Sequence, residues 1–291
     1  MDLQTHYYKT TAGFQLALHC SLPTGKPVLY FTHGNGFASK MYEPMLRHLI
    51  DHYDLVLLDA QGHGDSEHGG AFVGWNRSSD FAAAAYQTMM NRYPTTVHIG
   101  IGHSFGGVLT ALMQAKYQLF QRIVLLDPVL FPPAMLLAMR LLKGLGIYQH
   151  NRLAKRARSR RHQFESYQQA FAYFNQRGLF RGWHEDALHA YLRHAMHQDG
   201  HGMRLKCSPQ RESDIFASFP HGLWQQLHGM RARTDLLLGQ NSYPFVHQSA
   251  RRLQRVAHDV HLHQQPGGHC FMQEQPLPTA LLIRQLLSSS Q

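Results

Sequence analysis

The sequence predicts an α/β protein in which helices flank a mostly parallel central sheet. Short apolar runs alternate with helical patterns along much of the chain, as in repeated strand and helix units. Polar or glycine-rich loops follow several of these runs, and the carboxyl ends of parallel strands gather at one edge of a sheet. One such loop, Gly102-His103-Ser104-Phe105-Gly106, carries a serine between two glycines. We therefore expect a functional site at that edge.

The elements of the sheet follow in order along the first half of the chain. Apolar runs predict strands over residues 14–20, 28–32, 55–59, 96–101 and 122–127. Helical periodicity predicts helices over 41–52, 78–93 and 104–117. Ser78 is the expected N-cap of the second helix and Pro94 its stop. In the first helix, four apolar residues are expected to face inward: Met45, Leu46, Leu49 and Ile50.

The serine between the two glycines is expected to be a nucleophile. Ser104 follows an apolar run and precedes the apolar segment 107–113, which begins a buried helix. A side chain at Gly102 or Gly106 would collide with the neighbouring strand or helix where the backbone turns. Such a strained strand-to-helix turn holds a serine hydroxyl clear of the backbone, so the pattern predicts a nucleophile elbow.

Three further loops accompany the elbow, each at the end of an expected strand. They are His33-Gly34-Asn35-Gly36, Asp59-Ala60-Gln61-Gly62-His63-Gly64-Asp65-Ser66 and Pro266-Gly267-Gly268-His269-Cys270-Phe271. With the elbow, the four motifs resemble in kind and order those of the α/β-hydrolase fold family, and the resemblance covers nearly the whole chain. The resemblance implies an α/β-hydrolase fold with a helical cap inserted over the active site.

The inserted cap is expected between Asp127 and the last strands. Alternation of strands and helices stops after Asp127 and resumes with a strand over 236–239, a helix over 244–256 and a strand over 260–263. The resemblance therefore predicts two parts, a core of residues 1–127 and 222–291 and a helical cap of residues 128–221.

The same resemblance predicts the groups that surround the serine. His269 follows the last strand and two flexible glycines, and is the expected base that takes the proton from Ser104 and returns it to the leaving group. The backbone N–H groups of Asn35 and Phe105 are the expected oxyanion hole. Two other histidines are expected to buttress these loops: His33 and His103.

The acid departs from the common family pattern. The loop after 236–239 offers only an amide and a hydroxyl, Asn241 and Ser242. Asp127 ends the strand 122–127 on the same edge of the sheet, where some relatives carry their acid, so Asp127 is the predicted third member of the triad. Asn241 and Ser242 would then support His269. The alternative is that Asp127 only caps the entrance to the cap. Two aspartates that precede their strands are expected at the opposite edge: Asp235 and Asp259.

Three function classes fit these residues. A serine at the elbow disfavours the epoxide and halide chemistry of relatives that use aspartate, and it favours acyl transfer to water through an acyl-serine. The leading interpretation is a serine hydrolase that cleaves a small or medium carboxylic ester or thioester. The alternatives are a lyase or carbon–carbon bond hydrolase acting on an anionic metabolite, and a non-catalytic ligand-binding or sensor protein. No cofactor is expected.

Positive charge is concentrated in the expected cap. The net charge is +10 with neutral histidines, and residues 152–161 hold six of the arginines and lysines. Such a cluster attracts an anionic substrate or an anionic membrane surface, and a merely solvated helical face is the simpler alternative. Nucleic acid is not an expected partner because no recognised binding module accompanies the charge.

Aromatic residues and histidines also gather in the expected cap. Residues 164–183 contain seven aromatic residues, which fit either an apolar acyl pocket or ordinary helix packing. His194, His197 and His201 are spaced to share one helical face. No carboxylate or cysteine completes a ligand set with them, so no metal site is expected.

Length and composition indicate one catalytic domain with an insertion. The 291 residues are 44% apolar and contain no Pro/Gly/Ser-rich linker. The longest apolar stretch, near residues 128–139, is too short to span a bilayer, and the first residues do not resemble a signal peptide. The three cysteines are an odd number without framework spacing. These observations predict a cytoplasmic protein.

Overall fold

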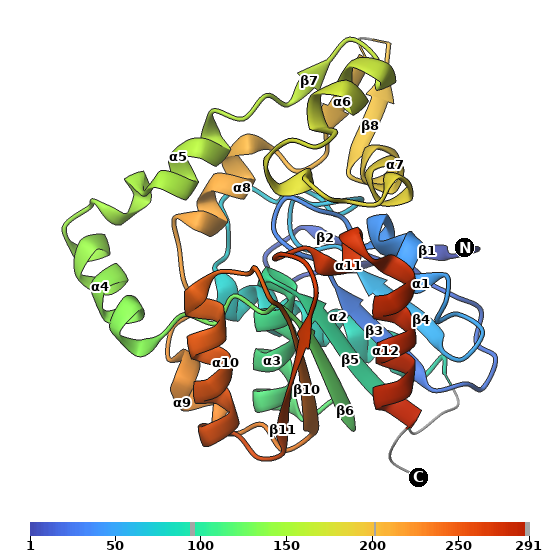
Figure 1. Cartoon of the computed structure of the whole chain (residues 1–291), viewed down its shortest axis with the longest axis vertical. Coiled ribbons are helices and arrows are strands. Elements are labelled where there is room, and N and C mark those ends of the chain that lie inside the picture. Colours follow the sequence, from blue (N-terminus) through green and yellow to red (C-terminus); the bar gives the residue numbers. More distant parts are fainter. Residues whose placement is uncertain (94–96, 201, 289–291) are drawn as a thin grey trace.

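The computed structural model describes residues 1–93, 97–200 and 202–288, and its centre is an eight-stranded sheet (Figure 1). The strand order is β1-β2-β4-β3-β5-β6-β10-β11. The first two strands pair antiparallel, β2 is antiparallel to β4, and the other neighbours are parallel. The strands are β1 (Gln4–Lys9), β2 (Gln15–Cys20), β3 (Val28–Thr32), β4 (Asp54–Leu58), β5 (His98–His103), β6 (Arg122–Leu126), β10 (Arg233–Gly239) and β11 (Val260–Gln265). The predicted α/β fold is confirmed.

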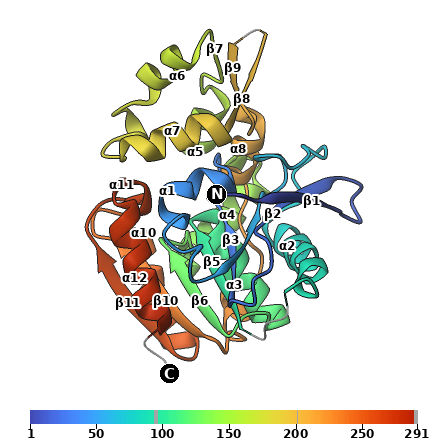
Figure 2. The same cartoon turned by 90° about the vertical axis from the view of Figure 1, so that its right-hand side faces the viewer.

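Helices cover both faces of this sheet (Figure 2). One face carries α2 (Trp75–Met90), α3 (Phe105–Tyr117), α9 (Leu223–Leu227) and α10 (Pro244–Val256). The other carries α1 (Glu43–Leu46), α11 (Phe271–Glu274) and α12 (Pro276–Ser288). Successive side chains of a strand point to opposite faces, so Leu29 and Tyr30 of β3 enter different cores. Burial on both faces explains why the parallel strands are continuous apolar runs.

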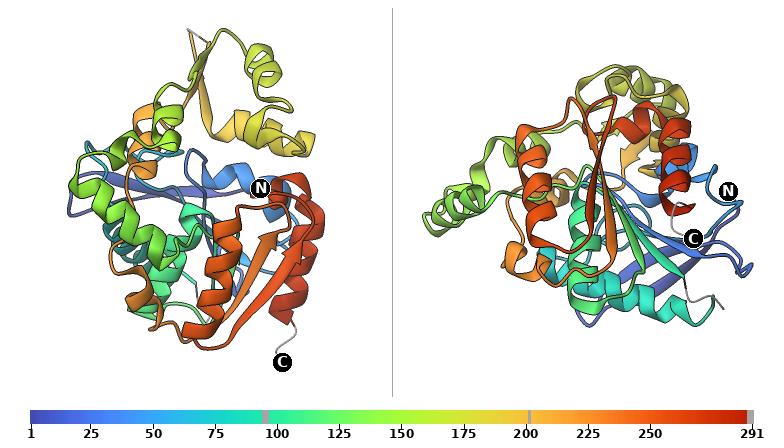
Figure 3. Two further views of the ribbon diagram at one scale, coloured as in Figure 1. Left: turned by 60° about the vertical axis from the view of Figure 1, so that its left-hand side comes forward. Right: turned by 60° about the horizontal axis from the view of Figure 1, so that its bottom comes forward.

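Most of the chain between β6 and α9 forms a further layer beyond the carboxyl ends of the strands (Figures 1 and 3). Its first half holds α4 (Pro133–Gly144), η2 (Tyr148–His150) and α5 (Arg152–Arg158). Its second half holds β7 (Gln163–Phe164), α6 (Tyr167–Phe174), η3 (Gly178–Phe180), α7 (Glu185–His194), β8 (Met196–Asp199), β9 (Gly202–Leu205) and α8 (Pro209–Phe216). The sequence led us to expect helices here, and the insertion also holds a three-stranded antiparallel sheet of β7, β9 and β8.

Two of the expected helices have different bounds. In place of a helix over 41–52, the chain forms η1 (Ser39–Tyr42), the short α1 and then turns up to Tyr53. The second helix, α2, begins at Trp75, and its N-cap is Gly74 with φ 88° instead of Ser78. The Ser78 hydroxyl donates to the Gly74 carbonyl oxygen, so it satisfies a group of the turn before the helix. Pro94 and Thr96, two other expected boundaries, lie outside the described residues.

Two expectations about polar residues are also wrong. Asp235 lies within β10 instead of before it, because the strand begins at Arg233, and the buried carboxylate accepts from Arg122 at 3.3 Å. The histidines expected on one helical face are divided between elements. His194 ends α7 and His197 belongs to β8, whereas His201 lies outside the described residues.

The described residues contain no helix with both the length and the apolar character needed to cross a bilayer.

Candidate active site

Ser104 occupies the turn between β5 and α3 in a backbone conformation that few residues adopt. Its φ and ψ are 53° and −115°, outside the helix and strand regions. A Cβ atom at Gly102 would lie 2.4 Å from the Gly106 carbonyl oxygen, and one at Gly106 would lie 2.3 Å from the Thr32 carbonyl oxygen. The collisions expected at both glycines are thus confirmed. The tight turn leaves the serine hydroxyl at the carboxyl edge of the sheet.

Three side chains from three separate loops meet at this edge. His269 Nε2 lies 2.9 Å from Ser104 Oγ, and His269 Nδ1 lies 2.5 Å from Asp127 Oδ2. Asp127 is fully buried, while Ser104 is 8% exposed and the His269 side chain 12% exposed. A carboxylate accepts hydrogen bonds, so Nδ1 carries a proton here and Nε2 is free to accept the serine hydroxyl proton.

The Asp127 carboxylate has two further donors besides His269. The Gly239 N–H donates to Oδ1 at 3.0 Å, and the Ser242 hydroxyl donates to Oδ2. Ser242 therefore contacts Asp127, where the sequence led us to expect support of His269. Asn241 donates its backbone N–H to the Gly267 carbonyl oxygen at 2.9 Å. Ser242 thus binds the carboxylate that binds His269, and Asn241 binds the loop that carries His269. Neither residue supports the imidazole ring directly.

The loop that carries His269 is fixed from two sides. A Cβ atom at Gly239 would lie 2.1 Å from the Gly268 carbonyl oxygen, so the end of β10 packs backbone against backbone on this loop. The Gly268 N–H donates to Glu274 Oε1 at 3.0 Å. The ring of Tyr243 lies 5.1 Å from the His269 ring. No local sequence pattern indicated Glu274 or Tyr243, because both contacts depend on how the loops fold back.

The backbone N–H groups of Asn35 and Phe105 have no hydrogen-bond acceptor within the part of the chain that the structure describes. Phe105 is the first residue of α3, where a helix leaves its N–H unpaired. Among the described residues, neither N–H donates a hydrogen bond outside regular elements. The Asn35 side chain donates from Nδ2 to the Glu212 carbonyl oxygen of α8 at 3.1 Å. The loop after β3 is thereby tied to the chain between β6 and α9.

Two buried histidines hold the loop after β3 through their neutral forms. His33 accepts the Ala60 N–H at Nε2 (2.9 Å), and its Nδ1–H donates to the Gly34 carbonyl oxygen (2.7 Å). His63 accepts the Gly36 N–H at Nε2 (3.0 Å). Burial lowers the pKa of His33 and lowers the pKa of His63 to about 3. An uncharged ring is what these acceptor roles require.

A third buried histidine connects this loop to the loop of His269. The Gly34 N–H donates to the Tyr42 hydroxyl oxygen (3.2 Å), and that hydroxyl donates to His103 Nδ1 (2.7 Å). His103 Nε2–H in turn donates to the His269 carbonyl oxygen (3.0 Å). Burial and the neighbouring His269 lower the pKa of His103 well below its usual value. The sequence had indicated His103 but not Tyr42.

Among the described residues, one group of side chains brings metal-type ligand atoms together. His19 of β2 lies close to Asp59 and Asp65, which belong to the loop after β4. Their atoms already have partners: His19 Nε2 is 2.9 Å from Asp59 Oδ2, and Asp65 binds the ammonium groups of Lys40 at 2.8 Å and Lys206 at 2.5 Å. Burial opposes ionisation of Asp59, but His19 and nearby N–H donors hold its pKa well below the usual range. The two lysines balance the charge of Asp65, and Asp59 is held by His19 and by the Ser39 N–H.

The aromatic residues of the insertion pack mainly on one another. The Tyr191 ring lies 4.8 Å from Phe180 and 5.3 Å from Phe174. The Tyr191 hydroxyl accepts from Arg160 at 2.6 Å, and Arg160 also pairs with Glu212 at 2.6 Å. The simpler expectation for these aromatic residues, packing, accounts for these contacts. The charge of Arg160 is thus neutralised inside the insertion.

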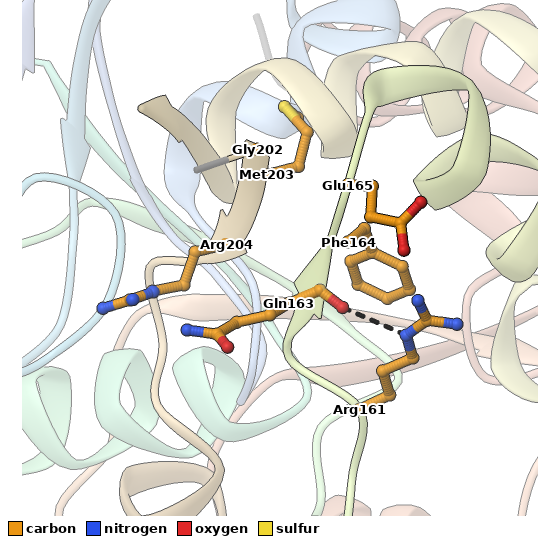
Figure 4. A pocket seen from close by; sticks show the side chains of 7 residues that line it. All are labelled: Arg161, Gln163, Phe164, Glu165, Gly202, Met203 and Arg204. Atoms are coloured by element: carbon orange, nitrogen blue, oxygen red, sulfur yellow. Dashed lines mark hydrogen bonds between the residues drawn. The ribbon is translucent and has the colours of Figure 1, made fainter. Parts of the chain in front are cut away.

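Two cavities lie away from Ser104. One of about 280 Å³ borders β7 and β9, where Arg161 Nε donates to the Gln163 carbonyl oxygen at 3.0 Å (Figure 4). The other, of about 720 Å³, lies between the start of α2 and the insertion, with Phe72 and Phe219 in its lining. Neither is lined by the side chains that meet at the carboxyl edge.

The sheet, the elbow and the loops together define an α/β hydrolase. A sequence model of the α/β hydrolase family matches residues 29–280, which is most of the chain. The chain belongs to this family.

A curated relative and several solved structures are similar to the chain. An abhydrolase domain-containing protein, AKT2 of Alternaria alternata, is 26% identical over 153 residues, which are 52% of this chain and 51% of that protein. The chain thus matches about half the length of this relative.

The solved structures are similar over nearly the whole chain. E-2-(acetamidomethylene)succinate hydrolase has a TM-score of 0.79 and 19% identity, covering 99% of this chain and 100% of its own. The peroxisomal α/β-hydrolase Lpx1 of Saccharomyces cerevisiae has a TM-score of 0.77 and 18% identity, covering 98% of this chain and 87% of its own. The thioesterase domain from the curacin biosynthetic pathway has a TM-score of 0.73 and 17% identity, covering 98% of this chain and 100% of its own. At these identities the likeness concerns the fold.

Proposed function

We propose that this hydrolase cleaves a small or medium carboxylic ester or thioester through an acyl-serine intermediate. Ser104 is the nucleophile, His269 the general base and Asp127 the acid that orients it. The observation that carries the proposal is the pair of contacts of one imidazole, 2.9 Å to Ser104 Oγ and 2.5 Å to Asp127 Oδ2. These are the distances at which a base removes a serine proton while a carboxylate fixes its tautomer.

Acylation of the serine is the first half of the reaction. Ser104 Oγ attacks the acyl carbon as its proton passes to His269 Nε2, and the buried Asp127 carboxylate stabilises the imidazolium that forms. The carbonyl oxygen becomes an oxyanion, which the N–H groups of Asn35 and Phe105 bind. The bond to the leaving group then breaks, and the alcohol or thiol departs with the proton from His269.

Hydrolysis of the acyl-serine is the second half. A water molecule gives one proton to His269 Nε2 as its oxygen attacks the acyl carbon, and the same two N–H groups stabilise the second oxyanion. The bond to Ser104 Oγ breaks, the serine recovers its proton from His269, and the carboxylic acid leaves. The catalytic groups therefore end the cycle in the protonation state in which they started it. In that state a neutral His269 lies between the Ser104 hydroxyl and the Asp127 carboxylate.

The insertion is the part proposed to select the acyl group. We assign residues 128–221 to a cap and residues 1–127 and 222–291 to the core. Two contacts support a cap beside the oxyanion hole: Asn35 Nδ2 bonds to the Glu212 carbonyl oxygen, and the Phe37 ring lies 5.7 Å from Trp183. The names of two structural neighbours, a thioesterase domain and a succinate-derivative hydrolase, agree with acyl chemistry.

The two alternative functions have less support. A non-catalytic sensor was suggested by the missing acid after β10, and the Asp127 carboxylate beside His269 removes that argument. A lyase or carbon–carbon hydrolase acting on an anionic metabolite calls for cap arginines directed toward Ser104. Arg160 instead pairs with Glu212, and Arg161 Nε donates to a backbone carbonyl of the insertion.

The test is covalent labelling of the serine with a fluorophosphonate probe, followed by mass spectrometry of the peptides. We expect the wild type to be labelled at Ser104, the variants Ser104→Ala and His269→Ala to remain unlabelled, and Asp127→Asn to react much more slowly. Release of nitrophenol from p-nitrophenyl esters of increasing acyl length then measures which acyl groups enter.

Matched variants separate loss of chemistry from loss of folding. Ser159→Ala and His258→Ala change exposed residues of the same types, and both are expected to keep full labelling. A wild-type protein that takes up no probe would refute the serine hydrolase. Labelling of Ser104 without hydrolysis of any ester or thioester would favour the alternative function, cleavage of a carbon–carbon bond.

A further inference from the structure

The outer part of the insertion exposes an unusual amount of apolar surface. Thirteen large hydrophobic side chains of the described residues are exposed, and six of them lie between residues 137 and 153. Leu145 is 71% exposed and Leu141 63% exposed. The six are Leu137, Leu141, Leu142, Leu145, Ile147 and Leu153. A contiguous patch of this kind marks an interaction surface more often than isolated exposed leucines do.

The geometry of α4 directs part of this apolar surface outward. Leu136 and Met139 are buried against the main core. With about 100° of rotation per residue, Leu137, Leu141 and Leu145 form a stripe on the opposite side of the helix. The helix is therefore apolar on two faces, and only one of them has a partner within the described residues. Figures 1 and 3 show α4 projecting at the margin of the molecule.

The charged residues of the segment that carries this stripe all have one sign. The sequence from Pro128 to Phe164 contains no aspartate or glutamate. It contains eight arginines and lysines, and seven of them are exposed in and after α4. These seven are Arg140, Lys143, Arg152, Lys155, Arg156, Arg158 and Arg161. Elsewhere the chain mixes both signs, so the outer insertion is a local cationic surface.

We propose that residues 133–158 dock on an anionic lipid surface. An amphipathic segment with leucines on one side and cations at its flanks lies in the headgroup region, where the apolar side chains enter the acyl boundary and the cations bind lipid phosphate and carboxylate groups. Each half of this pattern is present here: the outward stripe of α4 supplies the apolar contact, and the residues around and after it supply the charge. The segment lies on the membrane and does not span it.

A lipid surface fits this segment better than a second copy of the chain. Two copies that buried the same stripe would bring their exposed cations together without an acidic residue from the segment to offset them. An anionic bilayer offsets all of them at once. The charge therefore favours a partner of the opposite sign.

Co-sedimentation with vesicles tests this surface. We expect the wild-type protein to sediment with vesicles of phosphatidylcholine containing about 30% phosphatidylserine, to remain in solution with phosphatidylcholine alone, and to be released by salt. The variant Leu137→Ser/Leu141→Ser/Leu145→Ser is expected to bind at least about 100-fold more weakly. The variant Arg152→Gln/Lys155→Gln is expected to lose about fivefold per charge removed.

A matched triple variant tests whether the loss of any three exposed leucines weakens vesicle binding. Leu22, Leu277 and Leu281 are exposed by 58%, 46% and 49% and lie outside the insertion, so Leu22→Ser/Leu277→Ser/Leu281→Ser is expected to bind as the wild type does. Thermal unfolding and probe labelling of Ser104 check that each variant is folded. Absence of wild-type binding to anionic vesicles, or equal binding to neutral vesicles, would overturn the proposal. So would a dimer in solution that the stripe variant dissociates, if vesicle binding were absent.

Discussion

The two sides of the candidate active site are held in opposite ways. On the side of the acid, a buried carboxylate, Asp127, accepts from His269, Ser242 and the Gly239 N–H. On the oxyanion side, buried neutral histidines, among them His63, hold the loop after β3. One side is organised by a buried carboxylate and the other by uncharged imidazole rings.

The difference follows from what each side does in the proposed reaction. A positive charge develops on His269, so a fixed negative charge beside it lowers the barrier. The oxyanion loop needs only well-placed N–H groups. A charged histidine there could not accept the N–H bonds of Ala60 and Gly36 that fix the loop. Changes on the acid side should therefore reduce the rate, whereas changes on the oxyanion side should alter how stability depends on pH.

The largest expected effect is that of Asp127→Asn. The amide keeps the size of the carboxylate but removes its charge and lets His269 adopt the wrong tautomer, so kcat for ester hydrolysis should fall about 10⁴-fold. Steady-state kinetics with a p-nitrophenyl ester measure it. Asp259→Asn, in an exposed aspartate just before β11, is the matched control and should keep wild-type kcat. A decrease of less than tenfold would show that Asp127 only shapes the loop.

Moving the acid to the neighbouring strand end is the second test. The Ser242 hydroxyl and the His269 ring contact the same carboxylate oxygen, so a carboxylate at position 242 starts close to the ring. Asp127→Ser/Ser242→Asp is expected to have a kcat about 10²-fold above that of Asp127→Ser alone, because a triad depends on geometry and not on chain position. Asp127→Ser/Asn241→Asp is the matched control. Equal recovery in both double variants would argue for a general charge effect.

Positions 127 and 242 also show how much of the candidate site could be predicted from the sequence. Asp127 could be singled out because it ends a strand at the functional edge and the loop after 236–239 has no acid. The sheet and the elbow could be predicted because apolar runs and flanking glycines leave local signals. Tyr42 could not, since its contact with His103 joins residues 61 positions apart. The small sheet of the insertion was missed because its strands are only two to four residues long.

The oxyanion side predicts a loss of stability in acid. Burial lowers the pKa of His63 to about 3 in the folded chain, against about 6.5 when unfolded, so between these values the unfolded chain binds a proton that the folded chain does not. The contribution is fully present above pH 6.5 and is lost as the pH falls, at about 1.4 kcal/mol per pH unit. Urea unfolding from about pH 6 to about pH 4.5 should therefore show a slope that is shallower by nearly this amount in His63→Gln.

A matched variant tests whether the loss of any histidine changes the dependence of stability on pH. His52→Gln changes an exposed histidine and should keep the wild-type dependence on pH. The buried His33 and His103 remain in both variants, so the wild-type slope should not vanish in His63→Gln. If both variants had the same slope as the wild type, His63 would have to bind its proton in the folded chain as well.

The smallest effect is expected from Ser242→Ala. This change removes one donor from the Asp127 carboxylate and leaves the Gly239 N–H and His269 in place. A hydrogen bond to a charged group contributes about 1.5 kcal/mol or somewhat more, so kcat should fall about tenfold while KM stays unchanged. Ser242→Thr keeps the hydroxyl and should recover most of the rate. Recovery by threonine but not by alanine would mean that Ser242 acts on the reaction only through the carboxylate, as a positioning residue at the strand end that lacks the usual acid.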